Sequence, residues 1–161
     1  KLNPKLILAY HYRSFYKWNY MHDSIGALKD ETIAVDLDTT NVRTLNQRFV
    51  MRREIHDYKD AIKDIDAIIR LNPNSSNYRN RGIVKGFMHN YAGAIIDYSK
   101  AIELNKQDTA SYYNRGLVEA FLQDYSKAML DLSKAIENDP NMGLAYMYRG
   151  EVQVLIGEKY K

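Results

Sequence analysis

The stretch that decides the fold is YYNRG at residues 112–116, followed by DYSKA at 124–128 and AIENDP at 135–140. The Tyr, Arg and Gly of the first stretch recur at one constant spacing, before it in YRNRG at 78–82 and after it in YMYRG at 146–150. Self-similarity at a fixed period of this length is typical of proteins whose units stack side by side, since one unit cannot bury its apolar face alone.

Each unit reads as two amphipathic helices. In residues 91–104 the apolar side chains fall at steps of three and four, which places them on one helical face. Asn, Asp and Pro mark the breaks between helices. The pattern predicts helices over 6–21, 24–38, 42–55, 58–71, 76–88, 91–104, 109–122, 125–138 and 143–156.

These stretches resemble the tetratricopeptide repeat, a helix–turn–helix unit of about 34 residues. The resemblance implies an all-α fold, a right-handed α-solenoid of antiparallel helix pairs. It divides the chain as follows: the end of a preceding repeat at 1–7, repeats at 8–41, 42–74, 75–108 and 109–142, and the first helix of a truncated repeat at 143–161. We therefore expect a fragment of a longer repeat array, with either flanking repeats or self-association through the C-terminal helix.

Composition excludes several classes of site. The 161 residues carry a formal net charge of +3 and contain no Cys, so disulfides and thiolate chemistry are absent. No apolar run approaches the roughly 20 residues that cross a membrane, and membrane insertion is not expected. We expect a cytoplasmic protein, with a removed signal peptide as the open alternative.

Catalysis is not predicted, and neither is a metal site or a cofactor. Three of the four His residues, His22, His56 and His89, lie at the turn inside successive units. Turns one repeat apart are separated by a helix-packing distance of about 8–10 Å, which is too far to share a metal ion. No nucleophile set or phosphate loop stands out.

One Arg and one Asp recur in each unit. The arginines are Arg13, Arg48, Arg81, Arg115 and Arg149, and the acids are Asp30, Asp64, Asp97 and Asp131. A catalytic residue has no reason to recur once per repeat, so we predict a ladder of ion pairs between the two helices of each unit. Partly exposed pairs of this kind contribute about 0–1 kcal/mol each and would mainly fix helix register.

In the tetratricopeptide family the first helix of each repeat lines a concave groove. The resemblance therefore implies two groups of peptide-binding residues. The apolar groove residues are Phe87, Tyr113, Leu117, Phe121, Leu144 and Met147. The basic groove residues are Arg43, Asn46, Arg53 and Arg79. Aromatic side chains and Arg are the residue types that protein interfaces favour.

Some tetratricopeptide co-chaperones clamp the acidic C-terminus of heat-shock chaperones. They use a Lys and an Asn in one first helix, an Asn in the next, and a Lys and an Arg in the third. The matching positions in the first three units are His11, Phe15, Gln47, Ser76 and Asn80. Neither this window nor the next two carry the set, so a clamp of that kind is not predicted.

The sequence thus predicts a scaffold that binds a partner protein, holding a peptide or helix in the groove. The alternatives are RNA or polyanion binding through Arg43, Arg52, Arg53 and Arg79, and a regulatory repeat region of a larger enzyme. Nucleic acid is not the expected partner, because the basic cluster covers one repeat and acids are nearly as numerous as bases.

Overall fold

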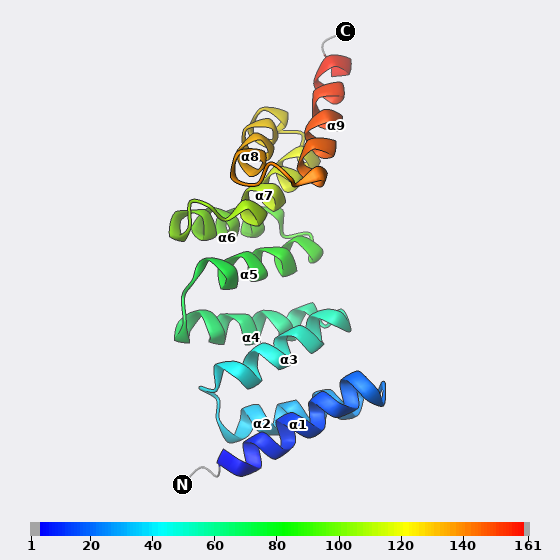
Figure 1. The fold of residues 1–161 in the computed structure, drawn as a ribbon, viewed down its shortest axis with the longest axis vertical. Coiled ribbons are helices and arrows are strands. Elements are labelled where there is room, and N and C mark those ends of the chain that lie inside the picture. The colour runs from blue at the N-terminus through cyan, green and yellow to red at the C-terminus, as the bar shows by residue number, and fades with distance from the viewer. Residues whose placement is uncertain (1–3, 160–161) are drawn as a thin grey trace. The chain divides into compact units, whose positions relative to one another are not determined.

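The computed structural model describes residues 4–159, and within them every regular element is an α-helix. The helices follow one another along the chain (Figure 1), and their ends lie within three residues of the predicted ones. Their bounds are α1 Pro4–Tyr20, α2 Ser24–Leu37, α3 Val42–Glu54, α4 Tyr58–Leu71, α5 Ser75–Phe87, α6 Tyr91–Leu104, α7 Thr109–Phe121, α8 Tyr125–Asn138 and α9 Gly143–Lys159. The all-α helical-repeat architecture is therefore confirmed. The expected end of a preceding repeat at 1–7 lies partly outside the described residues.

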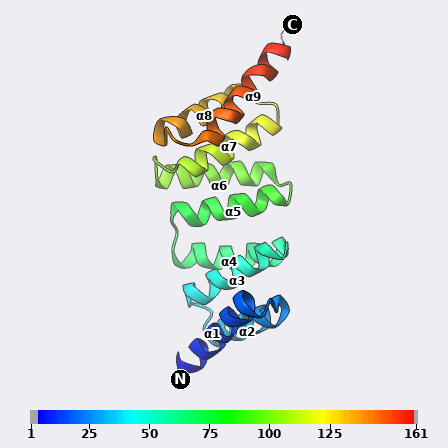
Figure 2. The same ribbon diagram turned by 45° about the vertical axis from the view of Figure 1, so that its right-hand side comes forward.

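The chain divides into two compact units, residues 1–73 and 74–161. In the N-terminal unit α1 packs on α2, α2 on α3, and α3 on α4. In the C-terminal unit α5 packs on α6, α6 on α7, α7 on α8, and α8 on α9. Both views of the ribbon show α6 beside α5 and α7 (Figures 1 and 2). Within each unit a helix therefore contacts its sequence neighbours, as expected when repeats stack in chain order.

Asp or Asn caps the N-terminus of each helix from α2 to α8. Side chains of Asp57, Asn90 and Asp124 accept a hydrogen bond from the backbone N–H three residues further on, which satisfies a donor that the helix leaves open. The residue just before each of these caps, such as His56 or His89, has a positive φ near 60°. The predicted turn histidines are exposed, and this conformation ends one helix so that the next can reverse direction.

Alanines and glycines let the paired helices approach closely. Ala27, Ala61, Ala94 and Ala128, which stand at equivalent places in the second helices, have no exposed surface. A Cβ at Gly82 would lie 2.7 Å from the ring of Tyr98, so this glycine makes room for a buried tyrosine. At Gly150 a Cβ would meet nothing within 4 Å, so no close contact requires a glycine there.

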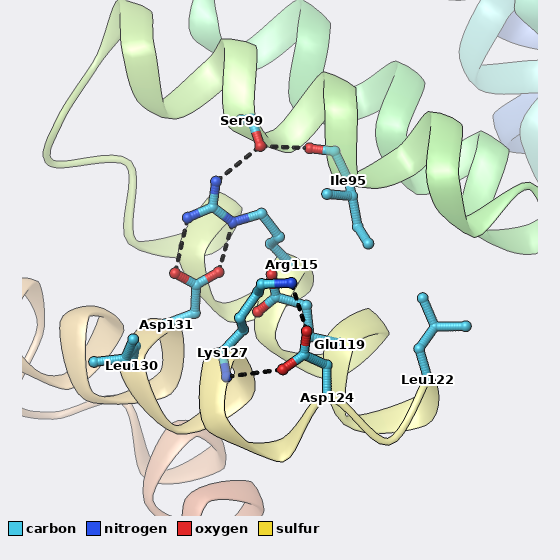
Figure 3. Close-up of a pocket in the computed structure, with 9 residues that line it drawn as sticks. All are labelled: Ile95, Ser99, Arg115, Glu119, Leu122, Asp124, Lys127, Leu130 and Asp131. Atoms are coloured by element: carbon cyan, nitrogen blue, oxygen red, sulfur yellow. Dashed lines mark hydrogen bonds and ion pairs between the residues drawn. The ribbon is translucent and has the colours of Figure 1, made fainter.

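The predicted ladder of ion pairs is present for four of the five arginines, while the fifth, Arg149, donates to the hydroxyl of Ser133 at 3.4 Å. Arg13, Arg48, Arg81 and Arg115 each donate two or more hydrogen bonds to the Asp of the partner helix, and the shortest bonds are 2.6–2.7 Å. Figure 3 shows the last pair, Arg115 with Asp131. The four carboxylates are almost fully buried, with side-chain exposures from 1% to 9%. Because the carboxylates are buried, removing one partner of a pair would leave a buried charge uncompensated, which costs more than breaking a partly exposed pair of the kind expected from the sequence.

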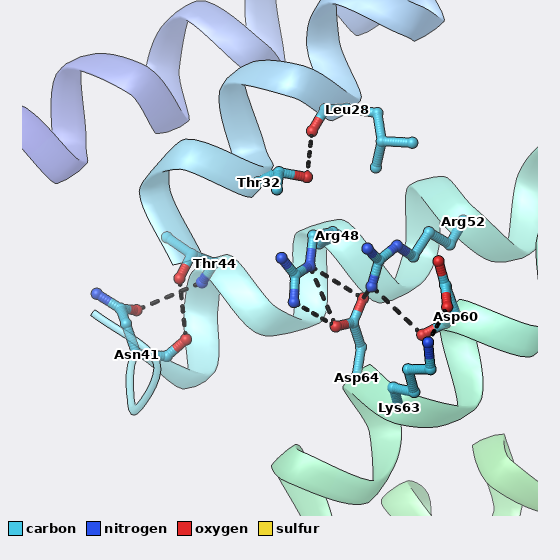
Figure 4. Close-up of polar contacts among 9 residues, drawn as sticks. All are labelled: Leu28, Thr32, Asn41, Thr44, Arg48, Arg52, Asp60, Lys63 and Asp64. Carbon is cyan, nitrogen blue, oxygen red and sulfur yellow. Dashed lines mark hydrogen bonds and ion pairs between the residues drawn. The ribbon is translucent and has the colours of Figure 1, made fainter. Parts of the chain in front are cut away.

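A second cation joins the ladder in three of the four pairs. It stands four residues after the arginine, one turn along the same helix. Lys17 contacts Asp30 at 2.8 Å, Arg52 contacts Asp64 at 2.6 Å, and Lys85 contacts Asp97 at 2.7 Å. Figure 4 shows the Asp64 carboxylate between its two arginines. In the fourth pair the equivalent residue is Glu119, an acid where the other repeats have a base.

Candidate protein-binding surface

An aromatic hollow of about 310 Å³ lies between α5, α6 and α7 in the C-terminal unit. Three of the six predicted apolar groove residues, Phe87, Leu117 and Phe121, line it. The other lining residues are Ile83, Gly86, Tyr91, Tyr98, Asn114 and Val118. The structure therefore brings half of the predicted apolar set together around one concave feature.

The rings of this hollow remain open to solvent. Phe87 is 55% exposed and Phe121 is 66% exposed, which is high for phenylalanine. The Phe121 ring lies against the Tyr91 ring, with centroids 4.8 Å apart and planes tilted by 46°. Tyr91 is in turn held by the ring of His89, whose Nδ1 is 2.8 Å from the Tyr91 hydroxyl. Exposed aromatic rings at fixed positions can bury apolar surface of a partner at little entropic cost.

The remaining apolar residues of the prediction lie elsewhere in the unit. Tyr113 packs on the core clusters of α8 and α9, and its ring meets that of Tyr148 at a centroid distance of 5.9 Å. Leu144 and Met147 are exposed on α9. Tyr113 is thus occupied in helix packing, while the other two stay available on the surface.

The predicted basic residues of the N-terminal unit lie on α3. The guanidinium of Arg43 lies over the ring of Tyr12 at 5.7 Å. Asn46 is half-buried. Arg53 contacts Glu54 at 2.8 Å and lies 5.9 Å from the centre of the Phe49 ring. Both arginines therefore have a partner within the fold.

Arg79, the fourth basic residue, belongs to the C-terminal unit and is ion-paired. Its Nη1 donates to both carboxylate oxygens of Asp108, at 2.6 Å each. Asp108 also accepts from Ser75 and caps α7 through the Ser111 N–H. Burial opposes ionisation of Asp108, but hydrogen bonds from Ser75 and Arg79 outweigh it and lower its pKa. The charge of Arg79 is thus largely balanced before any ligand arrives.

A second apolar hollow, of about 520 Å³, lies in the N-terminal unit. Its walls are Ser24, Ile25, Leu28, Lys29, Thr32, Ile33 and Ile55. Ile25 is 84% exposed, an unusual state for isoleucine. None of these residues was predicted as part of a site, although Ile25 lies on the face of α2 opposite its buried residues, which is a signal that the helical period could have given.

A metal-binding cluster and a membrane-spanning helix are both absent from the part of the chain that the structure describes. Residues 4–159 contain no cluster of three or more His, Asp or Glu suited to a metal ion. They also contain no helix with the length and apolar character that crossing a bilayer requires.

The paired helices and the repeating Arg–Asp contacts define a helical-repeat protein with an exposed aromatic hollow. Residues 109–142, which are α7 and α8, match the family model described as tetratricopeptide repeat. The chain contains a tetratricopeptide repeat at these residues, and its fold is that of tetratricopeptide repeat proteins.

Known proteins of similar sequence and structure agree with this assignment. Human tetratricopeptide repeat protein 6 is 32% identical over 74 residues, which cover 46% of this chain and 14% of that protein. The crystal structure of MamA superposes with a TM-score of 0.86 at 24% identity, over 96% of this chain and 85% of that one. The first repeat domain of Spaghetti (RPAP3), bound to an HSP90 peptide, superposes with a TM-score of 0.69 at 22% identity, over 74% of this chain and 96% of that one.

Proposed function

We propose that this chain is a protein-interaction module that seats an apolar side chain of a partner protein in the aromatic hollow of α5, α6 and α7. The observation that carries the proposal is the exposure of Phe87 and Phe121 around one concave feature. Single exposed apolar side chains are ordinary on a monomer, whereas aromatic rings grouped around a concave feature are what an interface uses as anchors.

The fold supports the same reading. The similar repeat domain of RPAP3 holds a peptide, so this architecture can present a peptide-binding face. The hollow of about 310 Å³ is at the small end of ligand pockets, which run from about 300 to 1,000 Å³. That size suits one or two anchoring side chains of a peptide or helix better than a bulky cofactor. Asn114 at its edge can fix the orientation of the partner backbone.

A negative charge introduced beside the hollow tests the proposal. Phe121→Asp places a carboxylate where an apolar side chain would be buried, while the ring it removes is already mostly exposed. We expect the variant to keep its helicity and to lose about 2 kcal/mol or more of partner affinity, roughly 30-fold in Kd.

The matched control is Ile96→Asp. Ile96 is 67% exposed in the same unit and lines none of the hollows described above. Partners captured by the wild-type chain from a cell extract are identified, and their affinities for the three proteins are then measured with purified components. Equal losses for the two variants, or full capture by Phe121→Asp, would show that the hollow is not the binding site.

A further inference from the structure

A second hollow of the C-terminal unit holds an acid at the position where the other three repeats have a base. It has a volume of about 570 Å³ and lies between α6, α7 and α8. Its polar walls are Ser99, Arg115, Glu119, Asp124, Lys127 and Asp131, and its apolar walls are Ile95, Leu122 and Leu130 (Figure 3). Glu119 occupies the position at which Lys85 neutralises Asp97 one repeat earlier.

The Glu119 carboxylate is buried with an unsatisfied oxygen. The residue is only 5% exposed, and its Oε2 has no hydrogen-bond donor. In Figure 3 the side chain lies at the hollow between Arg115 and Lys127. An unsatisfied buried oxygen costs about 1–3 kcal/mol, more for a charged group, so native proteins rarely keep one without a reason.

The charges around the hollow do not balance. Three carboxylates face it, from Glu119, Asp124 and Asp131, against the two cations Arg115 and Lys127. Arg115 is committed to Asp131 at 2.6 Å and Lys127 to Asp124 at 2.5 Å. With Glu119 ionised, the hollow is therefore short of one positive charge.

The protonation of Glu119 reflects this shortage. The pKa of Glu119 is raised to about 7, mainly by burial and also by the charges of Asp131 and Asp124, against the opposing effect of Arg115 and Lys127. No titratable side chain of α6 lines the hollow. Near neutral pH the carboxyl can thus be ionised by a small gain in favourable charge, such as an incoming cation supplies.

We propose that this hollow accepts the side chain of a lysine from a partner protein, whose ammonium group binds Glu119 and Asp131 as Lys85 binds Asp97. The three apolar walls suit the four methylene groups of lysine, since such stems pack on apolar surface while the ammonium seeks acceptors. A metal ion is disfavoured because the described residues contain no cluster suited to one. A guanidinium is disfavoured because that of Arg115 already spans both oxygens of Asp131.

The proposal rests on the proposed function in that it requires a protein partner, but it concerns a different hollow and can fail separately. The probe is n-butylammonium chloride, which reproduces the lysine stem and head. It is titrated into the protein near pH 7 and followed by amide NMR and by the carboxyl carbon of Glu119, with sodium chloride as the ionic control. We expect saturable binding at about millimolar concentration, shifts centred on residues 115–131, and ionisation of Glu119.

Two variants decide the outcome. Glu119→Lys restores the pattern of the other repeats and should fill the hollow with its own ammonium, so that saturable binding is lost. Glu119→Gln keeps the shape and should weaken binding by about tenfold or more, since a charged acceptor is replaced by a neutral one. Glu119→Gln also keeps the test decisive if Glu119→Lys folds poorly.

Glu137→Gln is the matched control. It removes an exposed acid of α8 that pairs with Lys134 and does not line the hollow. Unchanged affinity in Glu119→Gln, equal weakening in Glu137→Gln, or shifts that grow without saturation would overturn the proposal. Phe121→Asp should bind butylammonium normally, which separates this test from that of the aromatic hollow.

Discussion

The buried carboxyl of Glu119 makes a quantitative prediction about stability. Its ordinary pKa of 4.5 is raised to about 7 in the folded chain. The folded state therefore holds a proton on Glu119 in a pH range where the unfolded state has released it. The sign follows from linkage: the free energy of unfolding falls as pH rises from about 4.5 to about 7, and the loss is complete above that window.

The size of the loss comes from the displacement of the pKa. One pKa unit corresponds to about 1.36 kcal/mol, so the raised pKa of Glu119 lowers the free energy of unfolding by about 3 kcal/mol at most. Glu119→Gln keeps the volume of the side chain and removes its titration. We expect the advantage of the variant over the wild type to grow by about 2–3 kcal/mol between pH 5 and pH 8.

Urea unfolding followed by helical circular dichroism at pH 5 and pH 8 provides the measurement. Comparing variant with wild type at each pH cancels the titration of all other groups. Glu103→Gln is the control, because Glu103 is exposed and its pKa is lowered by Lys100, so it is ionised at both pH values. If the advantage of Glu119→Gln is the same at pH 5 and pH 8, the burial of an unpartnered carboxyl has been misjudged.

Two further predictions concern the packing of the helix pairs. Gly82→Ala should destabilise the chain by about 1–3 kcal/mol, since the new methyl group would meet a buried tyrosine ring at 2.7 Å. Gly150→Ala should stabilise it by up to about 1 kcal/mol, because the space around Gly150 is open. Thermal unfolding compares the two variants, and melting-temperature shifts of the same sign would contradict this difference in packing. Asp97→Ala should lower the free energy of unfolding in urea by about 2–4 kcal/mol, since Arg81 and Lys85, which are only about a fifth exposed, would lose their carboxylate partner. Glu103→Ala, which removes an exposed ion pair, should change little. Equal effects of the two variants would refute the ladder as a stabilising feature.

Most of the fold could be predicted because the same residue types recur at a constant spacing in several successive repeats. The constant period sets the helix ends, and the recurrence of one Arg and one Asp predicted their contact across the helix pair. Burial of the acids could not be predicted in this way, since spacing says which residues share a face but not how deeply that face lies. The same limit applies to Gly82, because the spacing of Tyr98 along its helix does not reveal that its ring lies against that glycine.

One position of the repeat departs from the pattern, and no prediction from the sequence was based on it. The residue four positions after the ladder arginine is Lys17, Arg52 and Lys85 in turn, and then Glu119. A comparison of this position across the four repeats would have identified Glu119 as the one acid among bases. The hollow beside it could not have been foreseen, because it depends on how the side chains of three helices leave space between them.

The candidate binding surface was only partly predictable. Assigning the first helices to one groove treated Phe121 and Tyr113 alike, although one ring is exposed and the other packs on Tyr148. The two residues meet different neighbours from α7, and only the positions of the surrounding helices decide which ring is covered. Tyr91 begins the predicted helix over 91–104 and was not predicted as a binding residue, yet it forms one wall of the aromatic hollow.

Hydrogen–deuterium exchange of the chain with and without a captured partner tests the proposed interaction most directly. With the partner at saturation, we expect slower amide exchange over residues 83–91 and 114–121, the backbone around the aromatic hollow, and no slowing there in Phe121→Asp. Unchanged exchange in those two segments, while the partner is demonstrably bound, would contradict the assignment of this surface.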